Sequence, residues 1–445
     1  MATQVAIPLY DQLSKDFQQR TVVPENEDDT LYNWRRRAFD KFRQQGFPSI
    51  RQEDWKYTNL VPYLKEELQT DLPSHDYNEI TPETVQKFYI NKLEANVLVL
   101  VNGELNTSLS SFHGDGDVSI QSINSAADHE LYRPYMGKEI DLRHDTLAAL
   151  NSALFNDGLF IEVRANAVVE KPLHIINLYT SPKNIFLQPR HLIVAHKSAA
   201  VSIIETSANI NNDAIVWINS VTEVYAEQNA QVNHYVLQSG LVNTREVNHT
   251  EVTQHTHSLY NNYTVTLPGA DLVRNNLNVN LVESATETHL YGLYLGADHQ
   301  LIDNHTTVDH RKPNCFSNEL YKGVLAGNAK AVFNGKIFVH REAQKTNAFQ
   351  QNNNLLLSDK AVIDSKPQLE IFADDVKCSH GSTAGQFNNE ALFYLRSRGI
   401  SESSARSLLV SAFAFDVINK IKVGALRSHI EKLINQNLQK WYASK

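Results

Sequence analysis

The sequence predicts a mainly β protein, in which a solenoid core is flanked by an N-terminal and a C-terminal α-helical domain. Short β-branched runs with few helix signals extend from about residue 159 to residue 380. A turn motif recurs within them at a spacing near 31 residues. Both ends of the chain carry apolar residues at helical spacing instead. The domain boundaries that we expect are 1–94, 95–386 and 387–445.

Composition narrows the possible functions. The 445 residues are 42% hydrophobic and 20% charged, which is typical of a globular protein. A net charge of −9 argues against nucleic-acid binding, because nucleic-acid-binding proteins usually carry a basic face. The two cysteines cannot build a disulfide framework and suit a reducing compartment. Neither a signal peptide nor an apolar run of about 18 residues is present, so we expect a cytoplasmic protein without membrane contact.

Residues 1–94 are expected to be mostly helical. Apolar residues fall at helical spacing between Leu31 and Phe42, and Gly46-Phe47-Pro48 ends that helix. A second helix is expected at Thr81-Pro82-Glu83, with proline at its first position. The run EDWKYTNL (53–60) lies between them, and its mixture of aromatic and charged residues is typical of a packed surface corner.

The core begins with ANVLVLVNGEL (95–105), a strand followed by an Asn-Gly turn signal. A single helix is expected near 144–155, from His144 to Phe155, before the long β region.

The repeat in that β region consists of a turn-type residue, usually an alanine, a spacer and usually an apolar residue. Its copies begin at Asn166, Ser198, Asn229, Gly269, Gly296, Asn328 and Asp359. Successive copies start 32, 31, 40, 27, 32 and 31 residues apart. This period favours a solenoid, in which each coil packs only on its neighbours. The alternative is an ordinary β-sandwich whose turns contain Asn-Ala or Gly-Ala.

The C-terminal region is strongly helical. Residues 390–398 form a helical run that ends at Gly399, and Ser401 can cap the helix that follows. The last two helices carry broad apolar faces, which must pack on the solenoid, on a partner, or on both.

The run KPQLEIFADDVKCSHGSTAGQ (366–386) is the strongest candidate site. In an extended strand Cys378 and His380 point the same way, and a thiolate beside an imidazole is a plausible metal-binding pair. A regular strand would add Glu370, Phe372, Asp374 and Val376 to the same face. From the residues alone, a structural role for the pair remains equally open.

The other candidate residues carry weaker signals. For most of the 18 histidines we expect polar positions on solvated strand faces, and we expect Cys315 to be a small buried apolar residue. Two cysteines cannot supply the four thiolates of an all-cysteine iron–sulfur cluster. The sequence contains no GxxxxGK[ST], GxGxxG, GxSxG, HExxH or CxxC motif, which weakens the case for an independent enzyme and predicts no nucleotide site.

The runs SKPQLEIFADDVKCSHG and EALFYLRSRGIS, together with EDWKYTNL and YKGVLAGNAKAVFNGKI, resemble the SufD family of iron–sulfur cluster assembly subunits. The resemblance implies a right-handed parallel β-helix that pairs with a SufB-like β-helix subunit. It also implies a SufC-like ABC ATPase docked on the C-terminal helices. In such a SufBCD complex the chain is a non-catalytic scaffold that supports iron acquisition, and ATP hydrolysis by the partner drives assembly.

The resemblance also implies roles for individual residues. A transient cluster, shared with the partner subunit, forms at the SufB–SufD interface, with His380 as a ligand or assembly residue and Cys378 as its neighbour. The apolar residues expected to dock the ATPase are Leu408, Phe413, Leu426, Ile430, Leu433 and Ile434.

Two other functions remain open from the sequence. One is a structural solenoid homodimer without a metal role, and the isolated chain could itself be such a dimer. The other is a β-helix enzyme that acts on polysaccharides through an acidic cleft.

Overall fold

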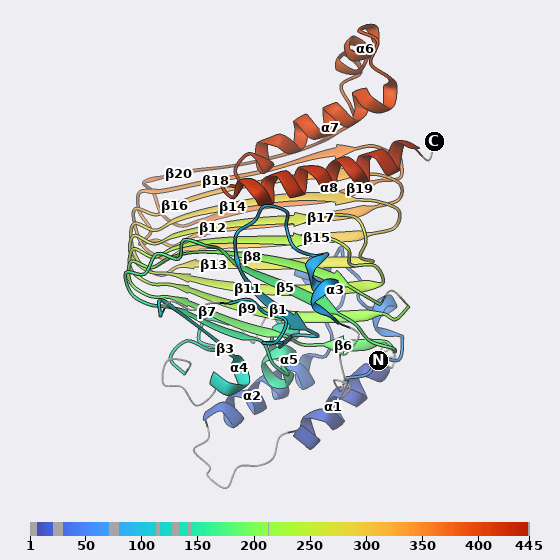
Figure 1. Cartoon of the computed structure of the whole chain (residues 1–445). Coiled ribbons are helices and arrows are strands. Elements are labelled where there is room, and N and C mark those ends of the chain that lie inside the picture. The colour runs from blue at the N-terminus through green and yellow to red at the C-terminus, as the bar shows by residue number, and fades with distance from the viewer. Residues whose placement is uncertain are drawn as a thin grey trace.

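The computed structural model describes residues 7–20, 30–70, 80–112, 116–126, 133–140, 145–211 and 213–443. Figure 1 shows a stack of long strands with helices below it and along its upper side. The strands form a parallel β-solenoid with helices at both ends, which confirms the predicted fold class.

Two sheets of strands make up the solenoid. Sheet 1 contains, in spatial order, β2 (Glu104–Leu105), β1 (Asn96–Val101), β5 (Leu173–Tyr179), β8 (Ala200–Asn209), β10 (Gln231–Gln238), β12 (Leu259–Thr266), β14 (Glu287–Gly296), β16 (Phe316–Leu325), β18 (Thr346–Leu356) and β20 (Val376–Gly385). Sheet 2 contains β19 (Val362–Ile371), β17 (Lys330–Val339), β15 (Leu301–His310), β13 (Leu272–Leu281), β11 (Thr244–Gln254), β9 (Val216–Ala226), β7 (Arg190–Ala195), β4 (Leu159–Val163) and β3 (Val118–Ser122), and β6 (Ile185–Leu187) also pairs with β9.

Each coil contributes one strand to each sheet. From β8 to β20 the chain alternates between the sheets, and all these pairings are parallel. One row of register partners in sheet 1 is formed by residues 201, 232, 260, 288, 317, 348 and 378. Successive members differ by 31, 28, 28, 29, 31 and 30 positions, so the period read from the sequence is close to one coil.

The predicted repeat combines turns from two different corners of the coils. Its first three copies begin at Asn166, Ser198 and Asn229, which have positive φ in the turns ahead of sheet 1 strands. Its last four copies begin at residues 269, 296, 328 and 359, which precede strands of sheet 2. The interval of 40 residues is where the pattern crosses from one corner to the other. Both corners use small or turn-forming residues, so they have the same local signature.

Helices cover the outer faces of both sheets. The helices are α1 (Pro8–Arg20), α2 (Thr30–Gln45), α3 (Pro82–Gln86), α4 (Ile123–Ala126), α5 (Thr146–Leu154), α6 (Asn389–Ser397), α7 (Glu402–Ile418) and α8 (Gly424–Ala443), with 3₁₀ turns η1 (Glu53–Trp55) and η2 (Val61–Leu64). Apolar residues of α1, α2 and α5 pack with Trp217, Val247 and Val332 of sheet 2. Apolar residues of α7 and α8 pack with Tyr235 and Leu293 of sheet 1.

Local signals predicted several of these elements. The helix expected near 144–155 is α5, whose N-cap Asp145 accepts hydrogen bonds from the backbone N–H groups of Leu147 and Ala148. His144 lies outside the described residues. The expected helix at Thr81 is only the five residues of α3, so the N-terminal region is less helical than predicted.

The two ends of the solenoid differ. At one end sheet 1 finishes in β2, which has two residues, and sheet 2 finishes in β3, which has five; both strands pair antiparallel to their neighbours. At the other end the sheets finish in β20 and β19, which have ten residues each and pair in parallel. Most residues of β20 are exposed. One end is therefore closed by short strands and the other presents two long open edges.

Candidate site at the open end of the solenoid

Cys378 and His380 lie on β20, at the open end. Both occupy inward-facing rows of sheet 1, where Cys378 is in register with Ala348 and His380 with Gln350. The Cys378 side chain is half-buried and packs against an apolar cluster that includes Ile337. Burial raises the pKa of its thiol. His380 is exposed. Sequence reasoning was therefore right that the two residues share one side of a strand.

Of the other residues expected on this face, Val376 shares it with Cys378, but Glu370, Phe372 and Asp374 do not. Glu370 belongs to β19 in sheet 2, whereas Val376 begins β20 in sheet 1, so the run 366–386 is not a single strand. Between these strands the chain turns at 372–375, with Phe372 57% exposed. Glu370, Phe372 and Asp374 consequently do not extend the face of Cys378 and His380. The sequence FADD contains neither glycine nor proline, and its two aspartates are a weaker turn signal.

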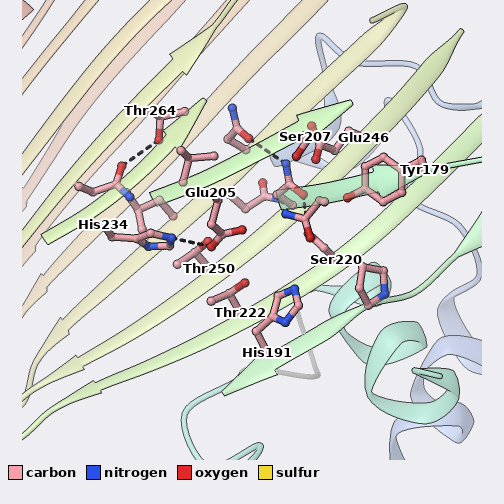
Figure 2. A pocket seen from close by; sticks show the side chains of 18 of the residues that line it. Tyr179, His191, Glu205, Ser207, Ser220, Thr222, His234, Glu246, Thr250 and Thr264 are labelled. Atoms are coloured by element: carbon pink, nitrogen blue, oxygen red, sulfur yellow. Dashed lines mark hydrogen bonds and ion pairs between the residues drawn. The ribbon is translucent and has the colours of Figure 1, made fainter. Parts of the chain in front are cut away.

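The interior of the solenoid is polar several coils away from this end, between the strands β5 to β13. A cavity of about 50 Å³ lies between the two sheets, which is room for a few water molecules. Its walls carry carboxylate, imidazole, hydroxyl and amide groups (Figure 2). Glu205 and His234 point toward each other there, with His234 Nε2 2.7 Å from Glu205 Oε1. Burial raises the pKa of Glu205, but the hydrogen bond and charge of His234 outweigh it and hold the pKa below its ordinary value.

Other cavity groups are tuned by burial. Glu246 is 4% exposed, and burial raises its pKa to about 7, although Asn248 and Gln238 donate hydrogen bonds to it. Burial lowers the pKa of His191, whose Nδ1 accepts a hydrogen bond from the backbone N–H of Leu159. The neutral ring of His191 therefore carries its proton on Nε2.

Sequence reasoning missed these interior groups. Most of the histidines were expected on solvated strand faces, yet His234 is 1% exposed. His310 also faces inward and is buried, and burial lowers its pKa to about 3. Alternation of polar and apolar residues does not say which face is solvated, so only the register of neighbouring coils could have revealed the polar interior. Cys315, expected to be a small buried residue, is 1% exposed within the apolar core.

The EDWKYTNL run was expected to be a packed surface corner, and it packs against Arg274 and Asp303 on the outer face of sheet 2. The Trp55 ring lies 3.7 Å from the Arg274 guanidinium, and Arg274 Nη1 lies 2.5 Å from Asp303 Oδ2. The Thr58 hydroxyl donates a hydrogen bond of 2.5 Å to the same carboxylate. His305 lies 3.0 Å from Asp303 Oδ1 on this outer face of sheet 2. His305 and His310 thus face opposite ways and form no joint site.

The C-terminal helices divide the expected docking residues into two groups. Leu426, Ile430 and Ile434 are at most 2% exposed and belong to the chain's own core, while Leu433 and Phe413 are partly buried against it. The chain itself therefore covers the first three. Leu408 is 51% exposed, and Phe393, Tyr394 and Phe415 are 74%, 58% and 52% exposed. Phe393 and Tyr394 lie on α6 and Phe415 lies on α7; they were missed because helical periodicity alone does not tell the covered face of a helix from its free face.

Cys378 and His380 do not form a complete metal site. In the part of the chain that the structure describes, no three His, Cys, Asp or Glu side chains gather in a way that could hold a metal ion. No helix within the described ranges is both long and apolar enough to cross a membrane.

Comparison with known proteins finds matching family models and relatives that are covered over most of their length. The family model described as the SufBD core domain of the SUF system for FeS cluster assembly matches residues 178–413, and the SufBD N-terminal region matches residues 8–175. A SufBD family iron–sulfur cluster assembly protein of Synechocystis is 33% identical over 428 residues, covering 94% of this chain and 93% of its own. SufD of Escherichia coli is 28% identical over 398 residues, covering 88% and 90%. SufD of Bacillus subtilis is 26% identical over 393 residues, covering 87% and 88%.

Proposed function

The chain belongs to the SufB/SufD family of iron–sulfur cluster assembly proteins and is SufD-like, and from this premise we propose that it is a non-catalytic scaffold subunit. It pairs through its open end with a SufB-like β-helix subunit, and it carries a SufC-like ABC ATPase on its C-terminal helices. The nascent cluster is the cargo of this complex. The two unpaired cysteines suit a cytoplasmic setting.

The observation that carries the proposal is the pair of long parallel edges at one end of the solenoid. Free strand edges are templates for pairing with another chain, and natural proteins usually shorten or cover them. The chain does so at the end that carries β2 and β3, but not at β19 and β20. A partner with matching edges would pair its backbone with both strands.

The location of Cys378 and His380 on β20 ties this interface to the cargo. The chain offers one thiol and one imidazole at the open edge, so the proposal assigns the remaining ligands to the partner. Because burial raises the pKa of Cys378, its thiol is mostly protonated at neutral pH, and His380 is the better candidate for a ligand.

In the proposal, α7 and sheet 1 transmit the movement of the ATPase to the open end. Lys322 on β16 points outward, with its ammonium 2.5 Å from Asp416 Oδ2 and 3.0 Å from the carbonyl of Phe413. Its side chain is only 7% exposed. In the proposal, ATP-driven movement of a partner on the exposed face of α7 is transmitted through this contact to sheet 1, whose last strand is β20.

The test is co-purification of the tagged chain from cells that co-express a SufB-like subunit and a SufC-like ATPase, followed by measurement of iron and acid-labile sulfide. We expect a second solenoid subunit and an ATPase to co-purify with the wild type. We expect His380→Ala to retain both partners and to lose most of the cluster, since its side chain is exposed and supports no core packing. His340→Ala is the matched control, because His340 is a half-exposed histidine of the β17 end.

Two outcomes would overturn parts of this proposal. Normal cluster content in His380→Ala would remove the ligand role of His380. If the chain purifies only with itself, the same two edges instead serve a structural homodimer, which is the second candidate function.

A further inference from the structure

Glu319, Gln350 and His380 occupy one inward-facing row at the open end. They lie on β16, β18 and β20, and the register pairs Glu319 with Gln350 and Gln350 with His380. Neighbouring strands in a sheet are about 4.8 Å apart, so each side chain stands directly over the next. The row leads from the closed interior to the exposed imidazole.

The amide of Gln350 is held in one orientation. Its Nε2 donates a hydrogen bond of 2.7 Å to Glu319 Oε2, and both side chains are buried, at 4% and 2% exposure. The carbonyl Oε1 of Gln350 has no hydrogen-bond partner among the described residues. A buried carbonyl without a partner loses its hydrogen bond to water without gaining another, so a free acceptor is unfavourable unless a donor reaches it.

Gly335 on the facing sheet makes room for this amide. A Cβ atom at Gly335 would lie 2.2 Å from Gln350 Nε2, which real atoms do not tolerate. The obstacle would be the far end of a flexible side chain, so an alanine there would push the amide aside without breaking the backbone. The position of the Gln350 amide is thus fixed from two directions, by Glu319 and by Gly335.

A histidine that binds a metal through one ring nitrogen usually donates the other N–H to an acceptor, which fixes its tautomer and ring orientation. We propose that Gln350, oriented by Glu319, accepts the N–H of His380 and so leaves the other imidazole nitrogen free for the metal of the nascent cluster. Gln350 is then a positioning residue for His380. The inference rests on the proposed function, because it assumes that His380 is a ligand.

The test reads the tautomer of His380 directly. Long-range ¹H–¹⁵N spectra of the full-length chain with labelled histidine distinguish the two neutral tautomers, and His380→Ala identifies the signal by its loss. At pH 8 we expect one dominant tautomer in the wild type and a mixture in Gln350→Leu, which keeps the bulk but removes the acceptor. Gln351→Leu is the matched control, because Gln351 is on the opposite, exposed face of β18.

The affinity of the complex for the cluster is a second readout, and Gly335→Ala is a second variant. In the co-expressed complex, Gln350→Leu should lower the cluster's affinity for the scaffold about tenfold, the usual effect of losing a residue that supports a metal ligand. If Gln350→Leu does not fold, Gly335→Ala should displace the amide and shift the tautomer in the same way. An unchanged tautomer in the variant that folds overturns the inference. If His380→Ala itself leaves cluster content normal, the proposed function fails instead.

Discussion

The buried carboxyl group of Glu246 should make the free energy of unfolding depend on pH, and Glu246→Gln should remove that dependence. The side chain lies inside the solenoid at 4% exposure, and burial raises its pKa to about 7, from 4.5 for a free side chain. The folded state therefore binds this proton more tightly than the unfolded state. The resulting stability is complete below pH 4.5, declines as the pH rises and is lost above about pH 7.

The magnitude follows from the difference in pKa. A difference of about 2.5 units at 1.36 kcal/mol per unit corresponds to about 3 kcal/mol. Glu246→Gln keeps the size of the side chain and an oxygen that can accept the hydrogen bond from Gln238, but it never ionises. The variant should match the wild type near pH 5 and exceed its stability at pH 8 by up to about 3 kcal/mol.

Thermal unfolding of both proteins between pH 5 and pH 8.5 measures this difference, with Glu390→Gln, a change at an exposed carboxylate of α6, as the control. The informative quantity is the unfolding free energy of Glu246→Gln minus that of the wild type at each pH, because the contributions of the other titrating groups cancel in this difference. A difference that does not change with pH would refute the reasoning that burial alone keeps Glu246 protonated.

Two further predictions concern the helical ends. Trp55→Ala should remove the ring that covers Arg274 and lower local stability by about 3–5 kcal/mol, because a buried aromatic side chain is lost. Amide hydrogen exchange should then become faster in residues 53–64 but not in β20. Tyr89→Ala, at a 40% exposed ring, is the control, and unchanged exchange in residues 53–64 would contradict a stabilising role for Trp55. Leu408→Asp should abolish co-purification of the ATPase and leave the solenoid partner bound, since Leu408 is 51% exposed on α7. Val242→Asp, which changes a 42% exposed apolar residue between β10 and β11, is the control, and ATPase binding that survives Leu408→Asp would move the docking surface elsewhere.

Local chemistry explains which features the sequence predicted. The coil period was recoverable because positions such as Ser198 and Asn229 adopt positive φ, which favours small and turn-forming residues. Assigning those turns to one corner was not possible, because the corner at residues 269 and 328 uses the same residues. The helix α5 was recognisable from its apolar run.

The candidate site was predicted only in part, for a physical reason. Strand alternation correctly placed Cys378 and His380 on one side, since that relation depends on two adjacent positions. The break before Val376 and the row through Glu319 and Gln350 depend on how distant strands stack, which no local pattern encodes. Burial of Ile430 likewise depends on sheet 1, which lies more than a hundred residues earlier at Tyr291.

The unequal ends of the solenoid also limit how large an assembly can grow. A rod with open edges at both ends would add copies head to tail without limit and form a filament. Here β2 and β3 end one side in short antiparallel strands, while β19 and β20 leave only the other side available. In the proposed complex, if the partner is also closed at its far end, no further solenoid can add to the stack once that partner covers the open side. The same edges that allow pairing therefore stop it at two.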